Sequence, residues 1–305
     1  MTILFSLPVG RSKESAFLRT LNILEYVEDS IVMLNLDVSI PRDYIEENLK
    51  IYMNKRVFIT MIPRMTRKDG AQYNSVHLHS HISNYKYAKS LNLKFHTIYF
   101  VSDSDMFFRK GLYSFIKNYD AGFQVCQNRL KPSNYKEIDF MEGQFVNQVK
   151  DSYYMDGLLS DPKITRVGSE QMEGEFYKET LFAKMLDYID NLAVHYSEAI
   201  SNVEEATFST VYFNIFMKDY PVYLPISTII RDDDLIRDNQ RLFNIITRQK
   251  EEVSLYKPST YPALHTFTFG FKRVKYNESQ HLIVNDLIKL AKQFLTHYGI
   301  PNEEL

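Results

Sequence analysis

The sequence predicts an α/β protein with a central, mostly parallel sheet and a helical C-terminal half. Three observations favour this class. The first 126 residues alternate strand-like and helix-like segments, the chain of 305 residues is long enough for one large domain, and hydrophobic residues make up 45% of it. Charged residues make up 24%, and the chain has 10 Gly and 10 Pro, so disordered and collagen-like proteins are excluded.

The N-terminal half follows the pattern of consecutive β-α units, which build parallel sheets. Apolar runs predict its strands, over residues 2–9, 31–36, 56–60, 95–101 and 121–126. Apolar residues at helical spacing predict its helices, over residues 14–27, 41–53, 75–91 and 112–118. We assign residues 1–126 to this half and interpret it as an α/β nucleotide-binding half.

The second half, residues 127–305, changes character, because helical patterns replace the alternation of strands and helices. Its predicted helices cover residues 139–149, 176–189, 204–217 and 280–298. No linker, internal repeat or low-complexity tract separates the two halves. We therefore expect them to pack as one compact body.

Charge and cysteine content narrow the range of functions. Lys and Arg total 36 and Asp and Glu total 38, giving a net charge of −2, which excludes a protein that coats nucleic acid. Cys126 is the single cysteine, which excludes a disulfide framework and a Cys-rich metal site. The N-terminus lacks the features of a signal peptide, and no apolar run reaches the roughly 18 residues that a membrane span needs. We expect a cytoplasmic protein; peripheral association with the inner membrane and the oligomeric state stay open.

Polar residues near the strand ends are the first candidates for a binding site, since parallel α/β sheets bind ligands beyond the carboxyl ends of their strands. The candidates are Pro8, Val9, Arg64, Asp103 and Asp105. No G-x-G-x-x-G or P-loop motif is present, which disfavours dehydrogenases and P-loop nucleotidases. Two carboxylates one residue apart can meet a divalent cation that bridges a diphosphate. The alternative is that these two acids cap a helix and close a turn.

Four groups of short sequence segments resemble the motifs of one protein family and follow one another in the same order as those motifs. They are residues 59–64 (ITMIPR) with 70–75 and 99–108 (YFVSDSDMFF), residues 168–171 (GSEQ) with 176–178, residues 203–210 (VEEATFST), and residues 269–273 (FGFKR). Together they resemble the core-2/I-branching type of glycosyltransferase, glycosyltransferase family 14, over nearly the whole chain. The resemblance implies a GT-A-like fold and inverting transfer of a hexosyl or N-acetylhexosaminyl group from a nucleotide sugar to a glycan hydroxyl. Bacterial surface polysaccharide is the expected product.

The resemblance also implies roles for individual residues. Glu205 corresponds to the general base, although Glu204 beside it stays an alternative because Val203 and Glu204 replace the Pro and Asp of the family motif. A carboxylate at the start of a helix is stabilised in its ionised form by the helix dipole. Glu173 and Glu175 are expected to contact the acceptor. The resemblance thus makes residues 1–126 the half that binds the nucleotide-sugar donor and residues 127–305 the acceptor-binding and catalytic half. The expected donor-binding residues are Pro8, Val9, Arg64, Asp103, Asp105, Lys272 and Arg273.

Cofactor use and two other functions remain to be distinguished. The family works without a metal, so no cofactor is expected, but Asp103 and Asp105 give a metal-dependent transferase using Mn²⁺ or Mg²⁺ as an alternative. A catalytically silent glycan-binding or scaffold protein on the same fold is the other alternative. His77, His79 and His81 lie on a predicted helix without a third ligand at matching spacing, so we interpret them as helix-face residues rather than a zinc site.

Overall fold

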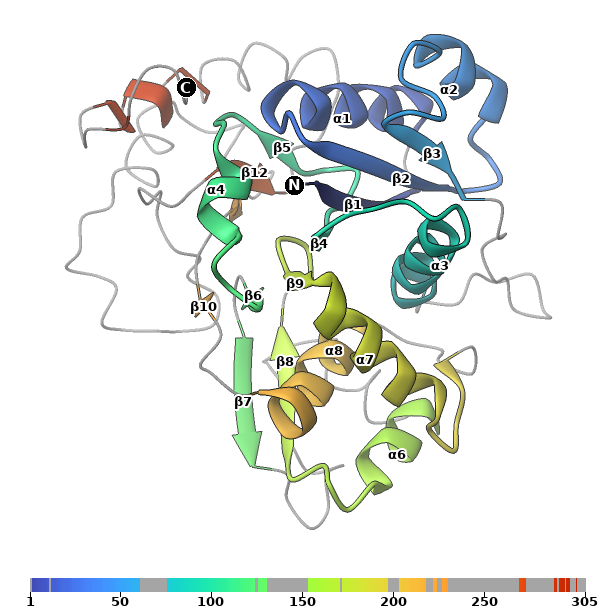
Figure 1. The fold of residues 1–305 in the computed structure, drawn as a ribbon, viewed down its shortest axis with the longest axis vertical. Coiled ribbons are helices and arrows are strands. Elements are labelled where there is room, and N and C mark those ends of the chain that lie inside the picture. Colours follow the sequence, from blue (N-terminus) through green and yellow to red (C-terminus); the bar gives the residue numbers. More distant parts are fainter. Residues whose placement is uncertain are drawn as a thin grey trace, which may run out of the picture.

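A seven-stranded mixed sheet forms the centre of this computed structural model (Figure 1). Its strands, in spatial order, are β10 (Val222–Tyr223), β6 (Ala121–Phe123), β9 (Phe176–Lys178), β4 (Thr97–Phe100), β1 (Ile3–Val9), β2 (Ser30–Leu36) and β3 (Val57–Ile59). Strands β4, β1, β2 and β3 are parallel, and β9 runs antiparallel to both β4 and β6. The predicted α/β class with a mostly parallel sheet is confirmed.

The structure describes residues 2–10, 12–60, 76–123, 126–130, 153–170, 172–196, 203–217, 222–223, 227–229, 269–272 and short stretches between 288 and 300. Arg64, Arg273 and the predicted helix over 139–149 lie outside these residues. Of the helix predicted over 280–298, residues 288–289, 291–293 and 295–296 are described, and they are helical.

Helices cover both faces of the sheet, because successive side chains of a strand point to opposite faces. Odd-numbered residues of β1, such as Phe5 and Leu7, share one core cluster with α1, α2 and α4. Leu4 of β1 and Met33 of β2 share a second core cluster with α3, α7 and α8. The helices of the first half are α1 (Lys13–Tyr26), α2 (Arg42–Asn48), α3 (Val76–Ser90) and α4 (Leu112–Ile116).

Helix α3 faces the sheet with several hydrogen-bonded polar side chains, Ser80, His81 and Asn84. The Asn84 amide donates to Ser6 Oγ (2.9 Å) and to the Met33 carbonyl (3.0 Å), and it accepts a hydrogen bond from the Thr60 hydroxyl. His81 Nδ1 lies 2.7 Å from Ser6 Oγ. Buried polar groups need such partners, so this network fixes α3 to three neighbouring strands.

The second half contains a two-stranded ladder against which helices pack. Strands β7 (Cys126–Leu130) and β8 (Arg166–Glu170) are antiparallel, and α6 (Tyr153–Ser160), α7 (Glu179–Asp190) and α8 (Glu204–Val211) lie beside them in Figure 1. Helix α8 continues into the π-helical segment η3 (Tyr212–Phe216). Asn214 of η3 joins this segment to β8: its Oδ1 accepts from the Arg166 N–H (3.0 Å) and its Nδ2 donates to the Arg166 carbonyl (2.8 Å).

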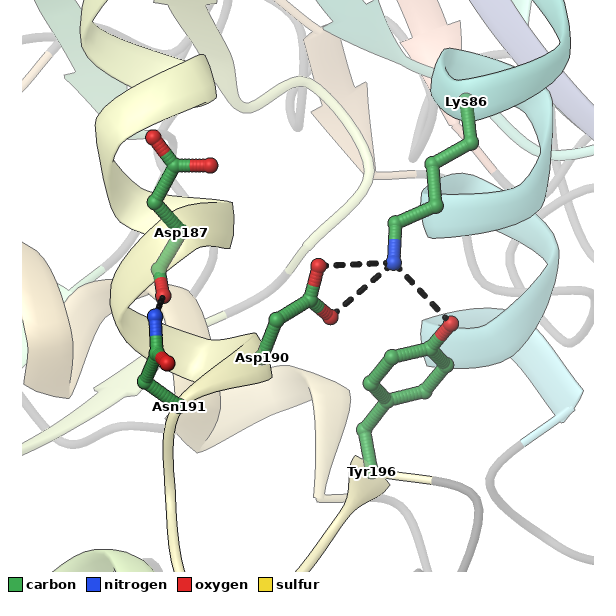
Figure 2. A network of polar contacts seen from close by, with 5 residues as sticks. All are labelled: Lys86, Asp187, Asp190, Asn191 and Tyr196. Atoms are coloured by element: carbon green, nitrogen blue, oxygen red, sulfur yellow. Dashed lines mark hydrogen bonds and ion pairs between the residues drawn. The ribbon is translucent and has the colours of Figure 1, made fainter.

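A polar cluster joins α3 to the end of α7, as Figure 2 shows. Lys86 Nζ lies 2.8 Å and 2.9 Å from the two carboxylate oxygens of Asp190 and 3.5 Å from the Tyr196 hydroxyl. Tyr196 lies in the segment that leads from α7 toward α8. No helix among the described residues is both long and apolar enough to span a membrane.

Three local predictions need correction. The helix predicted from residue 176 begins at Glu179 instead, because Phe176 and Tyr177 are buried between β4 and β6 as strand β9. The single strand predicted over 121–126 is two strands, β6 and β7, of different sheets. The helix predicted over 204–217 is α-helical to Val211 and π-helical after it. Helix α6 and strand β8 were not predicted, although the apolar residues of α6 stand at helical spacing (Tyr154, Met155, Leu158 and Leu159).

Candidate functional site

The turn after β4 is held against the loop between β1 and α1. Asp103 accepts a hydrogen bond from the Gly10 N–H at Oδ2 (3.0 Å). Its carbonyl accepts from Ser15 Oγ (2.6 Å) and from Arg19 Nε (3.3 Å). Asp103 is 6% exposed and Arg19 is 1% exposed, so this junction is packed inside the protein. The strand-end acids and the start of α1 therefore form one rigid edge of the sheet.

Asp105 closes the same turn from within. Its Oδ2 accepts from the Ser102 N–H (2.9 Å) and its Oδ1 from the Ser102 hydroxyl (3.2 Å), while its own N–H donates to the Ser102 carbonyl (3.1 Å). This is the turn-closing role that was the alternative to metal binding. Among the described residues, no group of three or more His, Cys, Asp or Glu could hold a metal ion.

A strand near the C-terminus of the chain pairs with the strand that directly follows this turn. Strand β12 (Gly270–Lys272) pairs antiparallel with β5 (Met106–Phe107), with Phe271 opposite Met106, and also lies beside β11 (Ser227–Ile229). Continued by one residue, this register puts the Lys272 position opposite Asp105. A Cβ on Gly270 would lie 2.6 Å from the Met106 carbonyl oxygen, so glycine is what allows this close approach. Residues 270–272, far away in the sequence, thus lie next to the strand-end acids.

The loop before β9 lies at the same edge. The Gly174 N–H donates to the Phe100 carbonyl (2.9 Å), and the Phe100 N–H donates to the Glu175 carbonyl (2.9 Å). Gly174 has a φ of 99°, a left-handed conformation that favours glycine. Because β9 runs antiparallel to β4, its first residues meet the last residues of β4. Glu173 is half-buried, whereas Glu175 is fully buried and its Oε1 accepts from the Tyr177 hydroxyl.

Helix α8 runs antiparallel to β8, which brings its first turn toward the same loop. Near its C-terminal end, Asn214 bonds to Arg166, and one turn earlier Thr210 Oγ1 accepts from the Gly168 N–H (3.0 Å). A further turn and a half toward the helix N-terminus leads to Glu205 beyond the end of β8. The charge of Glu173 acts on the neighbouring Glu204, which agrees with this placement. Glu205 is therefore on the side of the strand ends, not on the opposite side of the sheet.

The two neighbouring glutamates differ in environment. Glu204 is 4% exposed, and its Oε2 has no hydrogen-bond partner among the described residues. Burial, and then the nearby charges of Glu205 and Glu173, raise the pKa of Glu204 well above its ordinary value. Glu205 is half-buried. A base must be ionised to accept a proton, so this difference favours Glu205 over Glu204 as the base.

The remaining predicted site residues lie at the end of β1, in β12, on α3 or outside the described residues. Pro8 and Val9 are the last residues of β1 and are buried, so Gly10 is the first exposed residue beyond that strand. Lys272 belongs to β12, but its side chain, like Arg64 and Arg273, lies outside what the structure describes. The three histidines lie on α3, as expected; burial, His195 and Lys86 lower the pKa of His79.

Sequence reasoning missed Arg19 as part of this edge. It occupies the inward face of α1 together with Ala16 and Ile23, three and four residues away, and it is buried with them. A basic residue at a core position of the helical repeat was the available signal. Ser15, which donates to the same carbonyl as Arg19, gave a weaker signal because small polar residues are common in the first turn of a helix.

No protein-family model matches the sequence, and no curated protein matches it. Among solved structures, the mannosyltransferase Ktr4p from S. cerevisiae is similar with a TM-score of 0.38 and 12% identity, over 71% of this chain and 66% of that chain. TarS from S. aureus is similar with a TM-score of 0.36 and 13% identity, over 74% of this chain and 37% of that chain. The galactosyltransferase LgtC, in complex with donor and acceptor sugar analogs, is similar with a TM-score of 0.41 and 9% identity, over 99% of this chain and 98% of that chain. Thus this chain spans about two thirds of the length of Ktr4p and about a third of that of TarS.

Proposed function

We propose that this protein is an inverting glycosyltransferase with a GT-A-like nucleotide-sugar-binding fold. It transfers a hexosyl or N-acetylhexosaminyl group from a nucleotide sugar to a hydroxyl of a glycan, as a step in bacterial surface polysaccharide synthesis. The observation that carries the proposal is the convergence of three separate segments at the carboxyl edge of the sheet. They are the turn 102–105 with the β12 strand opposite it, the loop 172–175, and the first turn of α8.

Each segment supplies one requirement of the reaction. The diphosphate of the donor needs cationic groups where charge develops on the leaving oxygen. Lys272 follows Phe271 in β12 beside the strand-end turn, and Arg273 is the next residue of the sequence. The acceptor needs polar contacts, and Glu173 is the partly exposed acid of the loop beside β4. Glu175 is buried against Tyr177, so its proposed part is to shape this loop rather than to touch the acceptor.

Glu205 is proposed as the base in a single displacement. The acceptor oxygen attacks the anomeric carbon as its proton passes to the Glu205 carboxylate, and the bond from the anomeric carbon to the diphosphate oxygen breaks. The nucleoside diphosphate leaves with the bonding electron pair, and the configuration at the anomeric carbon inverts. The start of α8 stabilises an ionised carboxylate, because the helix dipole is positive there.

We propose that the leaving group is stabilised by basic side chains of the chain, without a metal. The alternative, a cation held by Asp103 and Asp105 together with the donor diphosphate, is favoured by the position of both acids at the end of β4. The two schemes differ in their response to a chelator. Transfer that continues in excess EDTA supports the basic residues, and transfer that stops and returns with Mn²⁺ supports the metal.

A thermal-shift screen of nucleotide sugars tests the donor class directly. A ligand at 100 times its Kd that binds only the folded state stabilises the protein by about 2.7 kcal/mol, a shift of a few degrees in Tm. We expect one nucleotide family to raise the Tm and the matching nucleoside monophosphate to raise it less, since the diphosphate contacts are then incomplete.

The variant Lys272→Met tests the donor site itself, because it removes the charge at the position opposite Asp105. This variant should lose most of the shift given by the nucleotide sugar. If no nucleotide sugar shifts the Tm of the unaltered protein, with or without Mn²⁺, the donor site does not exist as proposed. A normal shift together with no turnover of any offered acceptor would favour the silent glycan-binding protein.

A further inference from the structure

The first turn of α8 carries two adjacent carboxyl groups with unequal surroundings. Glu204 follows the fully buried Val203 and is itself enclosed, whereas Glu205 is half-buried. The N-cap residue of this helix, Val203, accepts no hydrogen bond with its side chain, and Glu204 Oε2 is left without a partner among the described residues. A buried ionised carboxylate with an unsatisfied oxygen is costly, whereas the same group is tolerated when it holds a proton.

The charged groups that act on Glu204 come from two elements. Glu205 belongs to the same helical turn, and Glu173 belongs to the loop 172–175 that approaches it from the end of β8. Both are carboxylates, so both oppose a second negative charge at Glu204. The hydrogen bond from its own backbone N–H works in the other direction, but burial is the largest influence.

This arrangement separates the two acids by function. Two carboxyl groups that interact this closely lose their protons in two steps that belong to the pair. Burial opposes the charged form of the enclosed member more strongly than that of the more exposed member. We propose that Glu204 is a positioning residue for the base: it holds a proton beside Glu205, keeps the pair at a single negative charge during transfer, and stops transfer when it ionises as the pH rises. The inference rests on the proposed function, because Glu205 is the base only if sugar transfer occurs.

Ionisation of Glu204 is expected to stop transfer because of where Glu204 and Glu205 lie. A second negative charge in the first turn of α8 would lie next to Glu173 and at the edge that receives the donor diphosphate. Like charges at a partly buried helix start repel, so the helix start and the donor would both be displaced from their productive positions. Above the pH at which Glu204 ionises, the active singly charged form falls by about tenfold for each pH unit.

The proton on Glu204 can be detected without any activity measurement, through the pH dependence of the Tm. The pKa of Glu204 is higher in the folded chain than in the unfolded chain, so the folded state binds this proton more tightly. Folding is therefore favoured below the unfolded pKa, and that contribution is lost as the pH rises toward the folded pKa. We expect the Tm of the unaltered protein to fall relative to Glu204→Gln from about pH 4 upward, since glutamine has no proton to lose.

Glu28→Gln serves as the matched control for this comparison. Glu28 is exposed and follows α1, so Glu28→Gln reports what the loss of a surface carboxylate does to the Tm over the same pH range. Parallel Tm curves for Glu204→Gln and the unaltered protein would overturn the proton-holding role. This result would not depend on whether the protein transfers sugars.

The catalytic part is tested by the ratio of kcat/KM at pH 9 to kcat/KM at pH 7, taken within each variant. We expect this ratio to be higher in Glu204→Gln than in the unaltered protein, by about tenfold for each pH unit between the ionisation of Glu204 and pH 9, because the fall at high pH disappears. An equal ratio, or loss of transfer at both pH values as in Glu205→Gln, would overturn the inference; the second result would make Glu204 the base. Absence of transfer by the unaltered protein at both pH values would overturn the proposed function, while the Tm comparison would still report the proton.

Discussion

Replacing Glu205 by glutamine should lower kcat for sugar transfer by at least about 100-fold while leaving donor binding unchanged. General base catalysis by a positioned side chain contributes about 10²–10⁴-fold, and glutamine keeps the shape of glutamate but cannot accept the proton. Because the donor is bound by the strand-end turn and β12, the thermal shift given by the nucleotide sugar should persist. Initial rates of product formation and the ligand-induced Tm shift, measured on the same preparation, check both halves of this expectation.

Glu28→Gln, an exposed acid far from α8 in sequence, is the control for the chemistry of the substitution. It should retain the rate of the unaltered protein. Unchanged turnover in Glu205→Gln would remove Glu205 from the mechanism. Loss of the Tm shift together with activity would indicate that Glu205 supports the donor site instead of acting as the base.

Substituting Gly168 by valine should both destabilise the protein and impair transfer. A Cβ at Gly168 would lie 2.4 Å from Ser209 Oγ and 2.8 Å from the Ser209 carbonyl carbon. The second of these atoms belongs to the backbone of α8, so rotation of a side chain does not relieve the clash, and the helix must move away from β8. Overpacking of this kind costs about 3 kcal/mol, and a displacement of about 1 Å at the base lowers the rate by about 100-fold. Urea unfolding and initial transfer rates measure the two effects.

A double-substitution cycle distinguishes this clash from a general effect of mutation. Ser209→Gly removes the two nearest atoms, so adding it to Gly168→Ala should recover part of the stability that Gly168→Ala loses. Strictly additive losses in the double variant would contradict the proposed contact between β8 and α8. Recovery of stability without recovery of transfer would show that the helix start is not restored by repacking alone.

The parallel part of the fold was predictable because each buried strand is a continuous apolar run. Strands β1 and β2 and helices α1 and α3 have their expected places and approximate bounds. Strand β9 was not predictable, because Phe176 and Tyr177 continue directly into the apolar pattern of α7 and nothing in their spacing distinguishes strand from helix. Their burial between β4 and β6 is a tertiary effect.

The candidate site was predictable where its residues follow a strand or begin a helix. Asp103, Asp105 and Glu205 are of this kind, and they lie at the expected edge of the sheet. The unequal burial of Glu204 and Glu205 was not readable from two identical adjacent residues, because it depends on how α8 packs against β8. The placement of β12 beside the turn likewise depends on a pairing between residues more than 160 positions apart, which local patterns do not encode.

A crystal structure of the protein with the nucleoside diphosphate that gives the largest thermal shift tests the central claim most directly. The account predicts diphosphate density between the turn 102–105 and residues 272–273, with the open side of the terminal phosphate facing the Glu205 carboxylate. Density at another edge of the sheet, or a Glu205 side chain directed away from the bound phosphates, would contradict it.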